Sequence, residues 1–190
     1  MTGSHADLWW LPVGADGFFV EHTLRWWESL RARREHRRPR PLFHAALELV
    51  DGDVSYAIEM TPTWGQPAGP RGVVASGPVG LRVLGVSRLF RYEVRCWKGG
   101  TIPDLDWAVE PPLRLPLSRG ETTTLLERVA AVPRLTWGRD AFGIKDPWTS
   151  NSLVSWLLHA AGIAATTLVP PDGGSAPGWR SGITAAADEA

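Results

Sequence analysis

Two stretches in which apolar and polar residues alternate, 43–50 and 53–61, flank the pair Asp51-Gly52. Alternation with a period of two is typical of a half-buried strand, and Asp-Gly is a favoured type I′ turn pair. The pattern therefore predicts a β-hairpin. One face of this hairpin carries the larger apolar side chains and is expected to face the core: Ala45, Leu47, Leu49, Val54, Tyr56, Ile58 and Met60.

The predicted turn also fixes which residues lie opposite one another. With Asp51 and Gly52 in the turn, Ala46 faces Ala57 and His44 faces Glu59. The face that holds these residues is polar but has two alanines at its middle. Small residues there would allow another element to approach closely.

Other stretches predict further elements along the chain. Strands are expected at 7–12, 18–20, 72–75, 90–97, 165–169 and 179–187, and a turn at 14–17. Helices are expected at 22–38, at 104–110 with Asp104 as its cap, and after Ser118, where Ser118 and Glu121 have the spacing of a capping box.

The most distinctive helix start is Thr149-Ser150-Asn151-Ser152, which leads into an apolar helix to about residue 161 with Gly162 after it. Backbone N–H groups at a helix N-terminus are unpaired, and the helix dipole favours negative charge there. Such a start can cap itself, bind an anion or hold an activated nucleophile.

Together these elements predict the α+β fold class, with a small, mainly antiparallel sheet and a few packed helices. A length of 190 residues suits a single domain over 1–190. The ends, 1–6 and 186–190, are expected to be loose.

Composition narrows the function classes. The formal net charge is zero, which gives no reason to expect nucleic acid as a partner, and the chain has no apolar run long enough to span a bilayer. The single cysteine, Cys96, excludes an internal disulfide and fits a cytoplasmic protein. Eleven Trp residues predict either a Trp-rich core or an aromatic-lined pocket.

Several common sites are not indicated. The chain has no phosphate-binding glycine motif, no HExxH or CxxC spacing and no GxSxG elbow, so we expect no cofactor and no metal. Six arginines lie between Arg31 and Arg40. They suit a solvated helix C-terminus better than a phosphate or nucleic-acid patch.

One set of polar residues could support catalysis. A nucleophile at a helix N-terminus needs a base to take its proton and a third group to orient that base. Ser150 is the candidate nucleophile, His44 the candidate base and Glu59 the candidate orienting group.

These motifs resemble the circularly permuted branch of the papain-like superfamily, which includes lecithin retinol acyltransferase-like proteins and permuted amidases. His44-Ala45-Ala46-Leu47-Glu48 resembles the family's early histidine strand, and Thr149-Ser150-Asn151-Ser152-Leu153 resembles its Asn-Cys-Asn-Ser/Thr-Phe motif. The stretches RYEVRCW, WGRD and APGW are also similar to those of an actinobacterial branch. The resemblance implies a papain-like fold with Ser150 where the family has its catalytic Cys.

Three interpretations of the helix start at residues 149–152 remain open. It belongs to a degenerate pocket, or to the site of a Ser–His hydrolase or acyl transferase, or it is simply an N-cap formed by Ser150 or Asn151. The enzyme would act on an amide or ester of a small molecule or peptide, with Trp148, Asn151, Ser152 and Asp140 as substrate contacts. The alternative function is a non-catalytic module that binds a ligand in a Trp-lined pocket, or a protein partner.

Overall fold

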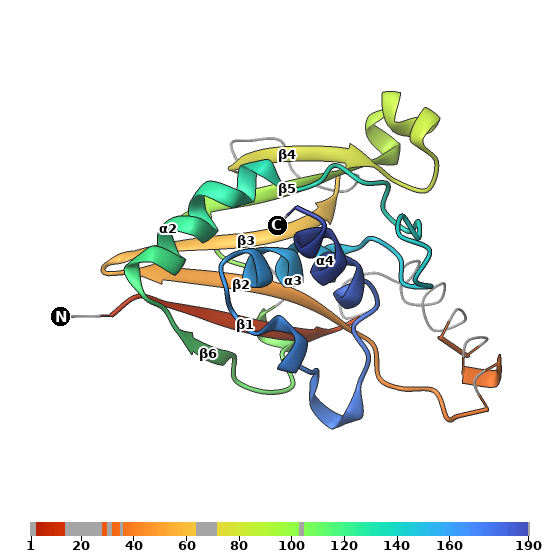
Figure 1. Cartoon of the computed structure of the whole chain (residues 1–190), viewed down its shortest axis with the longest axis horizontal. Helices are drawn as coiled ribbons and strands as arrows, with labels where there is room; N and C mark the ends of the chain where they lie inside the picture. The colour runs from red at the N-terminus through yellow and green to blue at the C-terminus, as the bar shows by residue number, and fades with distance from the viewer. Residues whose placement is uncertain are drawn as a thin grey trace.

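The computed structural model describes residues 3–13, 28–29, 32–34, 36–63, 72–102 and 105–189. The described strands form one six-stranded sheet in the order β4-β5-β3-β2-β1-β6, and all neighbouring pairs are antiparallel (Figure 1). The α+β class is confirmed. The strands are β1 (His5–Pro12), β2 (Phe43–Asp51), β3 (Val54–Pro62), β4 (Val73–Pro78), β5 (Arg91–Lys98) and β6 (Leu113–Pro116).

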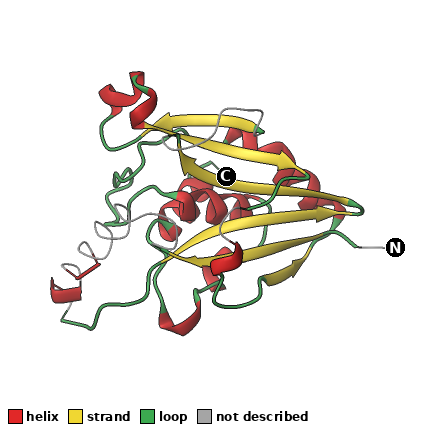
Figure 2. Ribbon diagram, turned by 180° about the vertical axis from the view of Figure 1, so that it is seen from behind, coloured by secondary structure: helices red, strands yellow, loops and turns green. Residues whose placement is uncertain are grey.

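Among the described residues, the helices α2 (Arg119–Arg128), α3 (Ser150–Ala160) and α4 (Trp179–Ala187) lie on one face of this sheet, so that the strands cross in front of them when the molecule is seen from behind (Figure 2). Short 3-10 turns connect the elements: η1 (Arg82–Val86), η2 (Arg88–Phe90), η3 (Leu105–Trp107), η4 (Val129–Ala131), η5 (Ala165–Thr167) and η6 (Pro171–Gly173).

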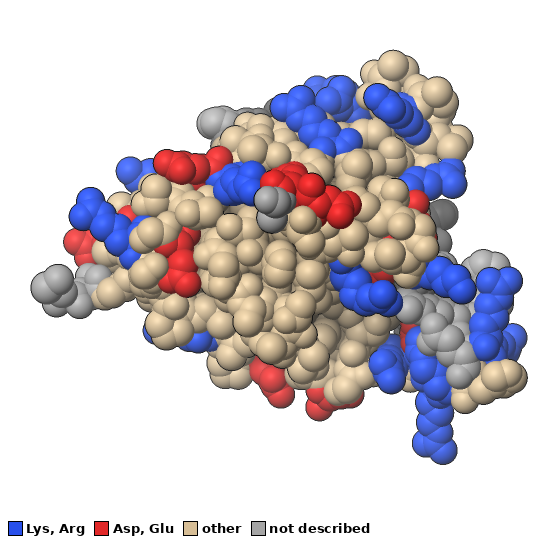
Figure 3. All heavy atoms as spheres, viewed as in Figure 1, with Lys and Arg blue, Asp and Glu red and all other residues tan. Residues whose placement is uncertain are grey.

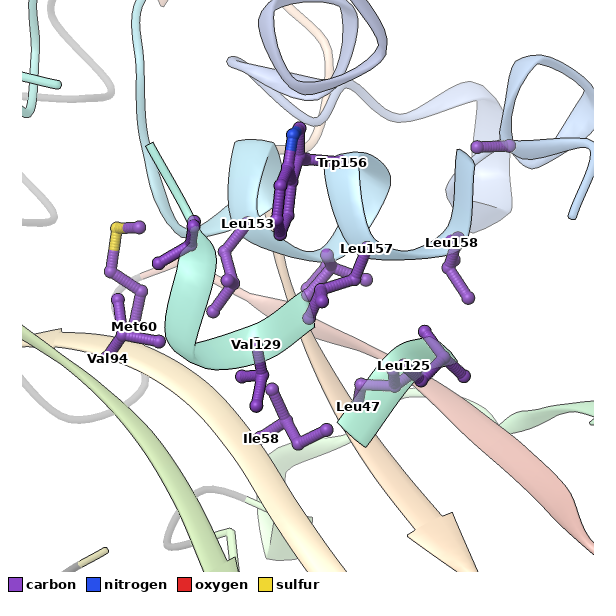
Figure 4. Packing of buried hydrophobic residues seen from close by; sticks show 14 of the residues in the cluster. Leu47, Ile58, Met60, Val94, Leu125, Val129, Leu153, Trp156, Leu157 and Leu158 are labelled. Atoms are coloured by element: carbon purple, nitrogen blue, oxygen red, sulfur yellow. The ribbon is translucent and has the colours of Figure 1, made fainter. Parts of the chain in front are cut away.

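Helix α3 is the centre of the main core. All its residues from Ser150 to Leu158 are buried, because the sheet covers one side of the helix and α4 the other. Figure 4 shows Leu153 and Leu157 among side chains from the sheet and from α2, including Ile58 and Leu125. A helix that is apolar on nearly all sides must be covered on nearly all sides.

The hairpin forms as predicted, but its register differs by two residues. Asp51 pairs with Val54, so the turn consists of Gly52 and Asp53 instead of Asp51 and Gly52. Gly52 has a φ of +61°, which suits a first turn position with positive φ, as in a type II′ turn. Moving the turn by one residue shifts each partner by two, and therefore leaves every side chain on its predicted face.

Other predictions meet mixed outcomes. The capping box at Ser118 and Glu121 is confirmed. The strands predicted at 7–12, 72–75 and 90–97 correspond to β1, β4 and β5, and most of their predicted ends lie within two residues of the observed ones. The strands predicted at 165–169 and 179–187 are wrong, since the first region contains η5 and the second is α4. The predicted elements at 14–20, most of the helix at 22–38 and Asp104 lie outside the described residues.

Candidate functional site

The first turn of α3 is held by its own polar side chains. Thr149 precedes the helix, and its Oγ1 accepts a hydrogen bond from the Asn151 N–H at 3.2 Å. In return, the Ser152 Oγ accepts a hydrogen bond from the Thr149 N–H at 2.9 Å. These bonds pair donors that a helix start otherwise leaves unpaired. The turn is thus an N-cap, but its capping residue is Thr149, not Ser150 or Asn151.

Asn151 joins this turn to the sheet. Its Oδ1 accepts a hydrogen bond from the Ala45 N–H at 2.6 Å, and its Nδ2 donates to the carbonyls of Phe43 at 3.1 Å and Pro177 at 2.8 Å. The ladder between β2 and β3 covers only Leu47–Asp51 of β2. The Asn151 amide, with one acceptor and a donor group in one plane, therefore takes the place of a strand beside Phe43 and Ala45.

The loop before α4 continues this pairing. The Phe43 N–H donates to the Ser175 carbonyl at 2.9 Å, and the Ser175 N–H donates to the Pro41 carbonyl at 2.8 Å. Further along, the Ser152 hydroxyl donates to the Gly178 carbonyl at 2.7 Å. Side chains of the predicted site thus fasten β2 and the start of α4 to the same helix end.

The approach of α4 to α3 requires glycine at two positions. Gly178 has a φ of +94°, and a Cβ there would lie 2.2 Å from the Thr149 Oγ1. A Cβ on Gly182 would lie 2.1 Å from both the Ser152 carbonyl oxygen and the Ser155 Oγ. Distances this short exclude any side chain without a shift of the helices.

Asp146 is a residue of this region that the sequence did not single out. Its carboxylate accepts hydrogen bonds from the N–H groups of Gly178 at 2.8 Å, Arg180 at 3.0 Å and Ser181 at 3.3 Å. It therefore caps α4, where a negative charge is favoured by the helix dipole. No local sequence signal pairs it with a helix start more than thirty residues away.

The backbone of His44 lies beside the start of α3, because Asn151 bonds to Phe43 and Ala45 on either side of it, but the His44 side chain is on the other face of the sheet. His44 lies opposite Leu11, which belongs to a second apolar cluster with Ala46 and Ala57. That cluster lies on the sheet face opposite α3, because Ala45 and Leu47, the odd-numbered neighbours, pack in the main core. Ser150 begins α3 on the other side. The geometry that a proton transfer from Ser150 to His44 would need is not formed.

The predicted position of Glu59 opposite His44 is also wrong, because β2 and β3 pair Leu47 with Ile58, which displaces Glu59 by two residues from His44. Glu59 lies opposite Arg95 of β5 and accepts a hydrogen bond from the Arg95 Nη1 at 2.9 Å. The Arg95 Nη2 also donates to Glu93 at 3.3 Å, so two carboxylates share this buried guanidinium. Burial lowers the pKa of His44 from 6.5 to about 4, which keeps its imidazole neutral at pH 7.

Trp148 and Asp140, the remaining predicted contacts, belong to neighbouring backbone segments, since the Trp148 N–H donates to the Arg139 carbonyl, but their side chains have different surroundings. Trp148 is fully buried in the main core. Asp140 is exposed and accepts hydrogen bonds from the N–H groups of Ile144 at 3.1 Å and Lys145 at 2.7 Å. Desolvation opposes the effect, but these backbone donors lower the pKa of the Asp140 carboxyl. Trp148 and Asp140 therefore support the core and a loop.

A surface that sequence reasoning missed lies between β4 and β5. Residues 81–90, which we call the arm, contain η1 and η2 and project beyond the sheet at the upper right of Figure 1. No arm residue is buried, although the arm is rich in apolar side chains. Six of these are exposed: Leu81, Val83, Leu84, Val86, Leu89 and Phe90. The sequence signal is an apolar run that fits neither strand nor helix periodicity.

The base of the arm forms an open hollow of about 420 Å³. Its lining is almost entirely apolar, and Arg139 is the charged residue among those that line it. The Arg139 Nε donates to the Gly80 carbonyl at 2.5 Å, so the guanidinium is held beside the hollow. The lining consists of Val79, Gly80, Leu81, Leu84, Leu89, Phe90 and Arg139.

Comparisons of this chain with protein-family models, with curated proteins and with solved structures found no significant match. Over the described ranges, three or more His, Cys, Asp or Glu side chains do not gather in a way that could hold a metal ion. In the same part of the chain, every helix is too short or too polar to cross a bilayer. The permuted papain-like resemblance stays a prediction.

Proposed function

We propose that this chain is a non-catalytic interaction module that binds a protein partner through the arm. The observation that carries the proposal is the exposure of six apolar side chains on one short, ordered segment. Val83 is 76% and Val86 92% exposed. Contiguous apolar surface of this kind is typical of sites that another molecule covers.

The arm is a preformed surface, because its backbone is held by local hydrogen bonds. The N–H groups of Leu84, Ser87 and Phe90 each donate to the carbonyl three residues earlier, at 3.0 Å. Gly85 packs against Pro78, since a Cβ at Gly85 would lie 2.8 Å from the Pro78 Cβ. A surface ordered before binding loses less conformational entropy when a partner binds.

The polar residues of the predicted catalytic site also support a non-catalytic function, because the hydrogen bonds of Asn151 and Ser152 go to the backbone of the protein itself. Asn151 and Ser152 donate to backbone carbonyls of β2 and the α4 loop, and His44 lies on the far face of the sheet. The competing function is the Ser150-dependent hydrolase or acyl transferase that the papain-like resemblance implies. If the chain shares that ancestry, its helix start serves structure in place of catalysis.

Two measurements on the full chain separate these functions. A photo-crosslinking amino acid in place of Val83 is expected to give covalent adducts between this chain and a partner protein, and the same substitution at Val169 is expected to give none. Val169 is a matched control, because it is a valine outside the arm that is 72% exposed. A serine-directed fluorophosphonate is expected to leave Ser150 unlabelled. Labelling that disappears in Ser150→Ala, or equal crosslinking from both positions, would refute the proposal.

A further inference from the structure

The hollow at the base of the arm is an open apolar depression that can accept a side chain from a partner. A volume of about 420 Å³ lies near the low end of the range for small-molecule pockets, about 300–1,000 Å³, but this hollow is open on one side and has few polar groups. Without several converging polar groups it cannot fix the orientation of a free small ligand. An apolar anchor on a larger partner needs no such groups, since the rest of the partner orients it.

The charged side chains of the arm itself are all positive. No acidic residue occurs from Val79 to Tyr92, whereas Arg82 and Arg88 are both exposed in the arm. Figure 3 shows Lys and Arg atoms beside the projecting arm in this view. An apolar surface that carries exposed arginines is complementary to apolar anchors flanked by carboxylates.

Arg139 is the arginine that lines the hollow itself. Its Nε donates to the Gly80 carbonyl, which holds the side chain at the hollow that it lines. The following residue, Asp140, directs its carboxylate to the N–H groups of Ile144 and Lys145. A planar guanidinium held in this way suits a carboxylate, which it can bind through two parallel hydrogen bonds.

The sheet edge beside the hollow is already paired, which limits how a partner can bind. The Trp137 N–H donates to the Pro78 carbonyl and the Gly80 N–H donates to the Trp137 carbonyl, both at 2.9 Å. A partner strand therefore cannot add to β4 at this point. Recognition by an amphipathic helix, which inserts side chains from one face, needs no free strand edge.

We propose that the arm and its hollow bind an acidic amphipathic segment of a protein partner. Its apolar face inserts between Leu84, Leu89 and Phe90, and its carboxylates bind Arg88 and Arg139. This inference rests on the proposed function and specifies the partner chemistry of the same surface. An anionic membrane is the other surface that exposed apolar side chains and arginines could meet, and the experiment tests it separately.

The experiment selects ligands from short random peptides displayed on phage, with the full wild-type chain as bait and Leu89→Asp for counter-selection. The enriched peptides are expected to carry apolar residues at helical spacing together with Asp or Glu. Their affinity is expected to fall about tenfold or more in Leu89→Asp and in Arg88→Glu, to fall with rising salt, and to stay unchanged in Val169→Asp. Circular dichroism of each variant serves as the control for folding.

Three outcomes would overturn the inference. Enriched peptides without acidic residues, or with no salt dependence, would refute the acidic partner while leaving the interaction module intact. Sedimentation with vesicles of phosphatidylcholine and phosphatidylserine that is lost in Leu89→Asp would assign the arm to a membrane. If no peptide loses affinity in Leu89→Asp, and if crosslinking from Val83 and Val169 is equal, the proposed function is refuted as well.

Discussion

Replacing Asn151 by Ala tests whether the start of α3 is a structural junction. The change removes three hydrogen bonds, but the Pro177 carbonyl keeps its bond from the Thr149 hydroxyl at 2.7 Å. The Ala45 N–H and the Phe43 carbonyl then lose the partner that Asn151 supplies, in a buried region. Each such group costs about 1–3 kcal/mol, so the free energy of unfolding should fall by about 4 kcal/mol.

The assay is urea and thermal unfolding, in which this loss corresponds to a fall in Tm of about 10 °C for a chain of this size. Ser150→Ala is the matched control, because Ser150 is the adjacent buried residue. The Ser150 hydroxyl makes none of the hydrogen bonds that join Asn151 to β2, so the expected loss is about 1 kcal/mol or less. A loss below about 1 kcal/mol in Asn151→Ala, or an equal loss in Ser150→Ala, would refute the reasoning.

Two further predictions concern the contact between α3 and α4 and the sheet face that carries His44. Gly182→Ala should lower the free energy of unfolding by about 2 kcal/mol, because its Cβ would meet Ser152 and Ser155. Gly120→Ala is the control and should not destabilise the protein, because its Cβ would lie 3.9 Å from the nearest atom; equal Tm values for the two variants would contradict the prediction. His44→Gln should flatten the pH dependence of stability. Burial lowers the pKa of His44 to about 4, so between that value and 6.5 the unfolded chain binds a proton that the folded chain does not, and stability falls as pH falls. From about pH 7 to pH 5 wild type should lose about 2 kcal/mol more than the variant in urea titrations, and parallel curves would exclude the effect.

The sequence was sufficient to predict features that depend on neighbouring residues. Alternation placed Leu47 and Ile58 on the core face, and the spacing of Ser118 and Glu121 placed a helix start. The register of the hairpin was not predictable in the same way. It depends on whether Gly52 takes the first or the second position of the turn, and Asp51-Gly52 and Gly52-Asp53 are both acceptable turn pairs.

Features set by distant residues could not be predicted from the sequence. The residues from Trp179 onward include Ile183 and Thr184, which are common in strands, yet they form α4, whose start is capped by Asp146 and which packs against α3. The role of Asn151 depends in the same way on Phe43, more than one hundred residues earlier. The local sequence showed a polar helix start but not which backbone groups it would pair.

The Asn151 junction also bears on the order in which the chain can complete its fold during synthesis. The start of β2 at Phe43 and Ala45 leaves the ribosome early, but its partners on one edge, Asn151 and Ser175, are made more than one hundred residues later. Until then, a nascent chain carries an unpaired strand edge, the kind of surface that pairs with other chains. Slow translation between these segments would therefore prolong the period of aggregation risk, and a chaperone that shields strand edges would be most useful in that interval.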